Sequence, residues 1–362
     1  MTKYSPPPGY TLGNQPYSRF GYDGTLYLPA RFGKVSALLP SVVSVPPAPP
    51  SRLSFASLSN SWYQVAQTDI GLLYGTVMKV TAGNTSTSTA ALTGSILGVP
   101  VPIWFKSNNT LSIGSGASFN IYYDGAGTTP AMTGVVPSVG IPVALTGAGL
   151  GMFLTWTSGT SVTGDSWKAC AAGMTDGSGN LLNYTSLTPS AQPLITAGVN
   201  GCPGLLFDGV DDIMTSLCNL PAPGTTPWVG TMVVKRPTTA AGNARMVSDG
   251  ADSTDILLSG ATTMTLFNGT LGPVGTGLPT STFGAVDYKY SNSAADYIHC
   301  GSGPIVSGAG AGNSVSNGRT ISGAAAPANI EVLQVGYIPA SAFDAAAYRA
   351  RVTAIYGGTV NV

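Results

Sequence analysis

The chain has 362 residues, of which only 8% are charged, and its 15 Lys and Arg residues balance 15 Asp and Glu residues. A neutral chain has no net field to attract nucleic acid or an acidic membrane surface, so we expect no nucleic-acid partner and no membrane insertion. Hydrophobic residues at 43% exclude disorder throughout, and 48 Gly with 27 Pro favour short strands joined by tight turns.

Residues 1–53 are predicted to form an extended arm. Proline runs at residues 6–8 and 46–50 favour the polyproline II conformation, and Tyr and Phe residues are spread between them. Such rings gain burial by packing on a neighbouring subunit, although a disordered linker would have a similar composition. The first residues lack the apolar core of a signal peptide, and no apolar run approaches the ~18 residues of a transmembrane helix.

Residues 54–157 are predicted to form a small β-domain. Apolar residues alternate with polar ones in several segments, and Gly-rich breaks separate these segments. The expected strands include residues 76–80, 119–123, 141–145 and 152–156. The order of residues 94–101, 116–124 and 139–144 resembles the small β-barrel decoration proteins of tailed-phage heads. This resemblance implies attachment to a capsid lattice, often as a trimer; a generic β-sandwich is the alternative.

Residues 158–362 are predicted to form a second β-domain. The stretch Phe207-Asp208-Gly209-Val210-Asp211-Asp212 resembles the signature strand of concanavalin-like (laminin-G-like) jelly-roll domains. A Gly-rich turn at residues 176–180 stands where that family has an earlier motif, but the Trp-x-Asp that usually precedes the motif is missing. The resemblance implies a C-terminal jelly roll. Further strands are expected at residues 228–235, 264–269, 283–288 and 330–335.

The last segment is predicted to be a helix that closes the jelly roll. Ser341 can cap its N-terminus with Asp344 three residues later, and Gly357 suits its C-terminal end. Apolar residues recur at helical spacing, and Arg349 and Arg351 are expected on the exposed side. The residues of the apolar face are Tyr348, Val352, Ile355 and Tyr356.

The cysteines and the single histidine, His299, argue against a zinc site, because no Cys-x-x-Cys spacing occurs. The four cysteines are Cys170, Cys202, Cys218 and Cys300. Two interpretations of them stay open: buried thiols, or a Cys202–Cys218 disulfide across the signature strand.

Calcium is the one ion for which the sequence offers ligands. Asp208, Asp211 and Asp212 supply hard oxygen donors, although Asp residues are also common in metal-free turns. No other cofactor is expected. Aromatic rings at the rim of a jelly roll can stack on sugars, so Tyr184, Tyr290 and Tyr297 are candidate glycan-binding residues, with ordinary packing as the alternative.

No catalytic set is evident in the sequence. A glycosidase needs two carboxylates at a fixed distance, and the chain has one glutamate, Glu331. A serine triad needs a histidine base, and His299 lies within a predicted strand. We therefore expect that the chain is not an enzyme.

Together these features lead us to expect an all-β virion protein of a tailed bacteriophage. It would decorate the capsid surface as a homotrimer, bind the major capsid protein or other virion subunits, and display a jelly roll able to touch cell-surface glycans. The first alternative is a tail-fibre or receptor-binding adhesin. A secreted lectin or glycan hydrolase is a third hypothesis, which would require an export signal and, for hydrolysis, a second glutamate.

Overall fold

The chain divides into two compact units, Met1–Arg52 and Leu53–Val362. The computed structural model describes residues 63–67, 72–80, 83–94, 96, 101–174, 184–216, 220, 226–237, 244–249, 254–260, 262–268, 270–278, 280–291, 296–308, 318–323 and 326–362. The predicted arm, the Gly-rich turn at residues 176–180 and Cys218 lie outside these residues. The division of the chain at residues 157 and 158 stays a prediction. The Cys202–Cys218 disulfide also stays one, because Cys218 is not described.

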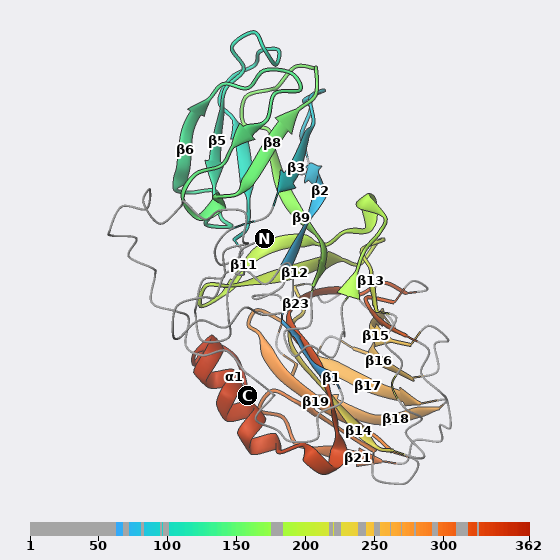
Figure 1. The fold of residues 1–362 in the computed structure, drawn as a ribbon. Helices are drawn as coiled ribbons and strands as arrows, with labels where there is room; N and C mark the ends of the chain where they lie inside the picture. Colours follow the sequence, from blue (N-terminus) through green and yellow to red (C-terminus); the bar gives the residue numbers. More distant parts are fainter. Residues whose placement is uncertain are drawn as a thin grey trace, which may run out of the picture. The chain divides into compact units, whose positions relative to one another are not determined.

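The described residues form an all-β structure with one C-terminal α-helix, which confirms the predicted fold class (Figure 1). The first strands are β1 (Tyr63–Gln67), β2 (Leu72–Val80), β3 (Ala90–Gly94), β4 (Trp104–Ser107), β5 (Phe119–Tyr122), β6 (Pro130–Val135), β7 (Val143–Ala144), β8 (Met152–Trp156) and β9 (Ser166–Met174). Within the described residues, no helix has the length and hydropathy needed to span a membrane.

Strands β2 to β9 form one curved ladder, in the order β6-β5-β4-β9-β2-β3-β8-β7. Phe119 of β5 and Trp156 of β8 are far apart in this order, yet their ring centroids lie 5.2 Å apart. The ladder must therefore bend back around its apolar side chains. Phe105 stacks on Trp167 in the same core, at 4.8 Å between centroids.

Strand β9 belongs to two strand groups. Its first residues pair with β4, its last residues pair with β10 (Tyr184–Thr185), and Cys170 in its middle pairs with β11 (Leu194–Val199). Seven of its nine residues are buried. A strand that is covered on both faces reads as a continuous apolar run, which explains why its sequence does not alternate.

The remaining strands form a two-sheet sandwich. They are β12 (Cys202–Asp208), β13 (Met214–Ser216), β14 (Trp228–Lys235), β15 (Ala244–Ser248), β16 (Thr254–Leu258), β17 (Thr263–Asn268), β18 (Leu271–Thr276), β19 (Gly284–Tyr290), β20 (Asp296–Cys300), β21 (Val306–Gly308), β22 (Arg319–Ile321) and β23 (Asn329–Pro339). One sheet runs β21-β20-β19-β14-β23-β12-β11, and β1 also pairs with β23. The other runs β18-β17-β16-β15-β22-β13-β10.

The interior of the sandwich contains apolar side chains from both sheets and the buried side chain of Arg319. Met232 and Tyr288 of the first sheet share a core cluster with Ile256 and Ile321 of the second. Arg319 lies among aromatic rings, with its guanidinium carbon 5.4 Å from the ring centroid of Trp228. Cation–π attraction of this kind offsets part of the cost of removing the charge from water.

Helix α1 (Ala345–Tyr356) covers the outer face of the sheet that contains β14, β19 and β23 (Figure 1). The predicted apolar face is confirmed, since Tyr348, Val352, Ile355 and Tyr356 are all buried. The predicted cap is wrong: Asp344 is the N-cap and accepts a hydrogen bond from the Ala347 N–H, whereas Ser341 lies in the short 3-10 helix Ala340–Ala342.

Candidate functional site

The turn after β12 brings together the three aspartates that the sequence singled out. Asp208 ends β12, where it pairs with Asn329 of β23, and Asp211 and Asp212 follow within four residues. Gly209 adopts a φ of 78°, a conformation that glycine reaches without strain. A Cβ at this position would lie 3.0 Å from the Asn329 Cβ, so a side chain here would also crowd β23.

Ligand oxygens of Asp208, Asp211 and Asp212 all lie within 4.8 Å of one another. Asp208 and Asp211 are exposed, whereas Asp212 is completely buried. Ca²⁺ binds oxygen ligands at about 2.3–2.6 Å, so two oxygens on opposite sides of one ion lie about 5 Å apart. The three carboxylates therefore have a spacing that one calcium ion can bridge.

The same carboxylates also hold the turn together. Asp208 Oδ1 accepts hydrogen bonds from the N–H groups of Val210 at 2.9 Å and Asp211 at 3.4 Å, and Asp212 Oδ2 accepts one from the Asp208 N–H at 3.0 Å. These contacts are those of an aspartate turn. They give the loop its shape without an ion, and they also fix the carboxylates close together.

Asn329 adds an amide to this site. Its Nδ2 donates to the Asp208 carbonyl oxygen at 3.0 Å, and its Oδ1 is buried without a hydrogen-bond partner among the described residues. An unpaired buried carbonyl oxygen costs about 1–3 kcal/mol. Amide oxygens are among the ligands that Ca²⁺ accepts, and Asn329 lies directly opposite Asp208 in the sheet.

Two of the three tyrosines proposed for glycan binding are core residues. Tyr184 and Tyr290 are fully buried; the Tyr184 hydroxyl lies 3.2 Å from that of Tyr337, and the Tyr290 hydroxyl donates to the Phe267 carbonyl oxygen. Side chains alternate between the two faces of a strand, and these two rings are on the face that points into the sandwich. The sequence alone did not show which face that is. As core residues, neither ring offers a surface to a sugar.

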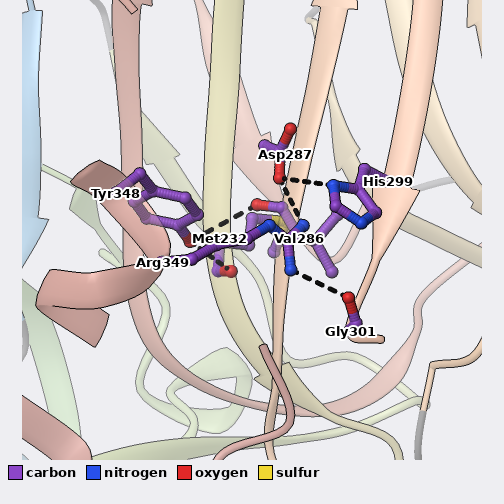
Figure 2. Close-up of polar contacts among 7 residues, drawn as sticks. All are labelled: Met232, Val286, Asp287, His299, Gly301, Tyr348 and Arg349. Carbon is purple, nitrogen blue, oxygen red and sulfur yellow. Dashed lines mark hydrogen bonds and ion pairs between the residues drawn. The ribbon is translucent and has the colours of Figure 1, made fainter. Parts of the chain in front are cut away.

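Tyr297 is half-buried and lies beside a second polar cluster. Figure 2 shows that cluster without Tyr297. At its centre is Asp287 of β19, whose side chain has no solvent exposure. Asp287 Oδ1 lies 2.5 Å from Arg349 Nη2 and 3.5 Å from His299 Nδ1. Arg349 Nη1 also donates to the Gly301 carbonyl oxygen, so helix α1 is joined to the sheet by charge as well as by apolar packing.

Burial lowers the pKa of His299, and the charge of Arg349 adds to this effect. Burial also raises the pKa of the Cys300 thiol to about 12, so this thiol is protonated and unreactive at neutral pH. The sequence expectation that Arg349 is exposed is wrong. The sequence did contain a signal for this contact: Asp287 is a charged residue at the centre of an apolar strand, and a buried charge needs a partner of opposite charge.

Glu331, the single glutamate, is buried in β23 and is held by two neighbours. Its Oε2 lies 2.5 Å from Lys235 Nζ, and its Oε1 accepts a hydrogen bond from the Thr196 hydroxyl. Lys235 also lies over the ring of Phe283. The contacts of Glu331 are those of a structural ion pair that joins β11, β14 and β23.

No family model matches the chain, and no curated protein matches it. Among solved structures, it is similar to a GH54 α-L-arabinofuranosidase soaked with a cyclic sulfate inhibitor, with 11% identity and a TM-score of 0.42 over 83% of this chain. It is also similar to an arabinofuranosidase complexed with arabinofuranosyl-α-1,2-xylobiose, with 9% identity and a TM-score of 0.41 over 80% of this chain. The chain covers 64% and 63% of those two chains, less than two thirds of their length.

This comparison contradicts the expected function. We expected a phage capsid decoration protein or a tail adhesin that is not an enzyme, whereas the similar solved structures are glycan-cleaving enzymes and none of them is a virion protein. The virion assignment and the expectation of no enzymatic activity are therefore both withdrawn. At 9–11% identity and TM-scores of 0.41–0.42, the similarity assigns no activity or substrate to this chain.

Proposed function

We propose that the chain binds Ca²⁺ at the turn between β12 and β13, and that the bound ion contacts a carbohydrate. The observation that carries the proposal is the cluster of three aspartates, with ligand oxygens within 4.8 Å of one another. All donors of the cluster are oxygens, which favours Ca²⁺ over Zn²⁺, because Zn²⁺ sites usually include Cys or His.

The exposure of the turn supports a role in recognition. Asp208 and Asp211 are exposed, so an ion held by them keeps coordination positions that face solvent. Ca²⁺ accepts six to eight oxygens, and sugar hydroxyls are ligands of that type. Val210, between the two aspartates in sequence, is 75% exposed and offers an apolar contact beside the ion.

The first test is calcium binding by the full chain. Isothermal titration with CaCl₂ after EDTA treatment should give saturable binding, and Ca²⁺ should raise the unfolding temperature. A ligand at a hundredfold excess over its Kd stabilises the native state by about 2.7 kcal/mol. Absence of both the binding heat and the thermal shift would contradict the proposal.

Asp211→Asn tests the site, because it removes one exposed ligand charge and keeps the size of the side chain. We expect weaker Ca²⁺ binding. Asp344→Asn is the matched control: it removes one carboxylate elsewhere, and Asn caps helices about as well as Asp. Equal loss of binding in both variants would show a nonspecific charge effect. A glycan array probed with the chain in Ca²⁺ and again in EDTA then tests the carbohydrate contact. Identical glycan binding in the two conditions would overturn the proposed contact between ion and carbohydrate.

A further inference from the structure

Two lysines converge on one tryptophan in the ladder formed by β4, β5 and β9. Trp104 of β4 pairs with Lys168 of β9 on one side and with Tyr122 of β5 on the other. Lys106 lies two residues after Trp104, so its side chain is on the same face. Lys168 Nζ lies 4.1 Å and Lys106 Nζ lies 4.6 Å from the Trp104 ring centroid.

The two ammonium groups have no carboxylate to neutralise them among the described residues of this ladder. The two carboxylates between residues 83 and 174, Asp124 and Asp165, are engaged elsewhere. Asp124 accepts hydrogen bonds from its own loop, residues 126–129, and Asp165 accepts them from Thr85 and Ser86. The pair of lysines is therefore a local concentration of positive charge in a neutral protein.

The positions of the lysines are unfavourable for two like charges. Both side chains are half-buried, and burial together with the nearby charge of Lys106 lowers the pKa of Lys168. The rings of Trp104 and Tyr122 offset part of this cost through cation–π attraction. A bound anion would offset the rest.

Hydrogen-bond donors at the cluster are also only partly used. Lys106 Nζ donates to the Gly127 carbonyl oxygen at 2.8 Å, but Lys168 Nζ has no hydrogen-bond or ion-pair partner among the described residues. The indole Nε1 of Trp104 is buried and has no acceptor among them. An oxyanion beside Lys168 would supply the acceptor that its ammonium group lacks.

We propose that Lys106, Lys168 and Trp104 form a binding site for the oxyanion of an acidic saccharide, a carboxylate or a sulfate. Two ammonium groups beside one ring favour a single small anion, whereas nucleic acid binding depends on neutralising many phosphates along a strand. The partly exposed ring of Trp104 suits the apolar face of a sugar. This site uses residues that are separate from the calcium site, so each proposal stands or fails without the other.

The test is titration calorimetry of the full chain at low salt with EDTA present, so that calcium plays no part. Three probes are compared: trigalacturonate, a neutral trisaccharide and sodium sulfate. We expect trigalacturonate to bind, the neutral sugar not to bind and sulfate to compete weakly. If sulfate binds as tightly as trigalacturonate, the site takes a free oxyanion and the saccharide part is overturned. If the neutral sugar binds equally well, or nothing binds, the proposal is overturned.

Variants locate the site. Lys168→Met keeps the length of the side chain and removes its charge, and should weaken trigalacturonate binding at least about tenfold. Lys168→Arg keeps the charge and should retain most of the affinity. Lys289→Met, in β19 of the sandwich, is the control for a general loss of charge and should bind like the unmodified chain. Circular dichroism confirms that each variant folds. Unchanged affinity in folded Lys168→Met would overturn the assignment.

Discussion

Asp287 of β19 and Arg349 of α1 form an ion pair of 2.5 Å between residues that are 62 positions apart, and the aspartate has no contact with solvent. Tyr348, the preceding helix residue, donates a hydrogen bond to the Met232 carbonyl oxygen of β14 (Figure 2). These two neighbouring residues therefore attach the helix to two strands of the sheet, and this attachment leads to the first two predictions.

Arg349→Met should lower the free energy of unfolding by about 3 kcal/mol, because it leaves a buried carboxylate without its ion-pair partner. Urea denaturation of the full chain measures the effect. The double variant Asp287→Asn with Arg349→Met removes both charges and should regain much of the lost stability. A double variant as unstable as the single one would show that the arginine acts through packing alone.

The stability of the chain should fall as the pH drops through the ordinary histidine pKa of about 6.5. Burial and the charge of Arg349 lower the pKa of His299 in the folded state, so below about pH 6.5 the unfolded state binds a proton that the folded state does not. The loss continues down to the lowered pKa. Asp287, Tyr297 and Arg349 are the ionisable groups around the ring.

His299→Gln should remove this part of the pH dependence, since glutamine does not titrate. Urea midpoints of both proteins, measured between about pH 7.5 and 5, give the comparison. Parallel pH profiles for the two proteins would assign the dependence to another group.

Asp124→Asn should destabilise the loop after β5 by about 1 kcal/mol, a value reduced for partial exposure. Desolvation by itself would raise the pKa of Asp124, but hydrogen bonds from Thr128, Thr129 and Gly127 outweigh it and hold the pKa well below its ordinary value. The stabilisation is therefore present above about pH 4 and is lost as the pH falls towards the lowered pKa. Thermal unfolding of the unmodified chain and of Asp124→Asn at neutral and acid pH tests this. A difference in unfolding temperature that is the same at the two pH values would contradict the prediction.

Gly209→Ala should destabilise the chain by about 1–2 kcal/mol and weaken Ca²⁺ binding. The φ of 78° strains alanine, and its Cβ would lie 3.0 Å from the Asn329 Cβ and backbone nitrogen. Calorimetry measures both effects. Gly83→Ala is the matched control: its φ of 83° is equally strained, but nothing lies within 4 Å of its Cβ. If Gly209→Ala lost stability but kept its Ca²⁺ affinity, the ion would not bind at this turn.

Gly230→Ala should destabilise the sandwich by about 1–3 kcal/mol through overpacking. Gly230 of β14 lies opposite Tyr288 of β19, and an added Cβ would overlap the tyrosine ring. Urea denaturation tests this. A neutral effect would mean that the buried ring of Tyr288 moves at little cost.

Much of the architecture could be predicted from the sequence because local patterns determine it. Alternating apolar residues between Gly-rich breaks placed a strand at residues 152–156, which matches β8, and the jelly-roll resemblance placed one at residues 228–235, which matches β14. Helical spacing identified the buried face of α1. The aspartate turn was also local, since its three carboxylates lie within five residues of the chain.

The other groups of interest depend on contacts between distant residues. Lys106 and Lys168 meet because β4 pairs with β9, and Asp287 meets Arg349 because α1 lies on the outer face of β19. Tyr184 and Tyr290 are core residues because each lies on the sheet face that is covered by the opposite sheet. Local spacing decides which segments become strands or helix. Only the packing of one sheet or helix on another decides which side chains lose water, and it is this loss that gives a buried charge or ring its role.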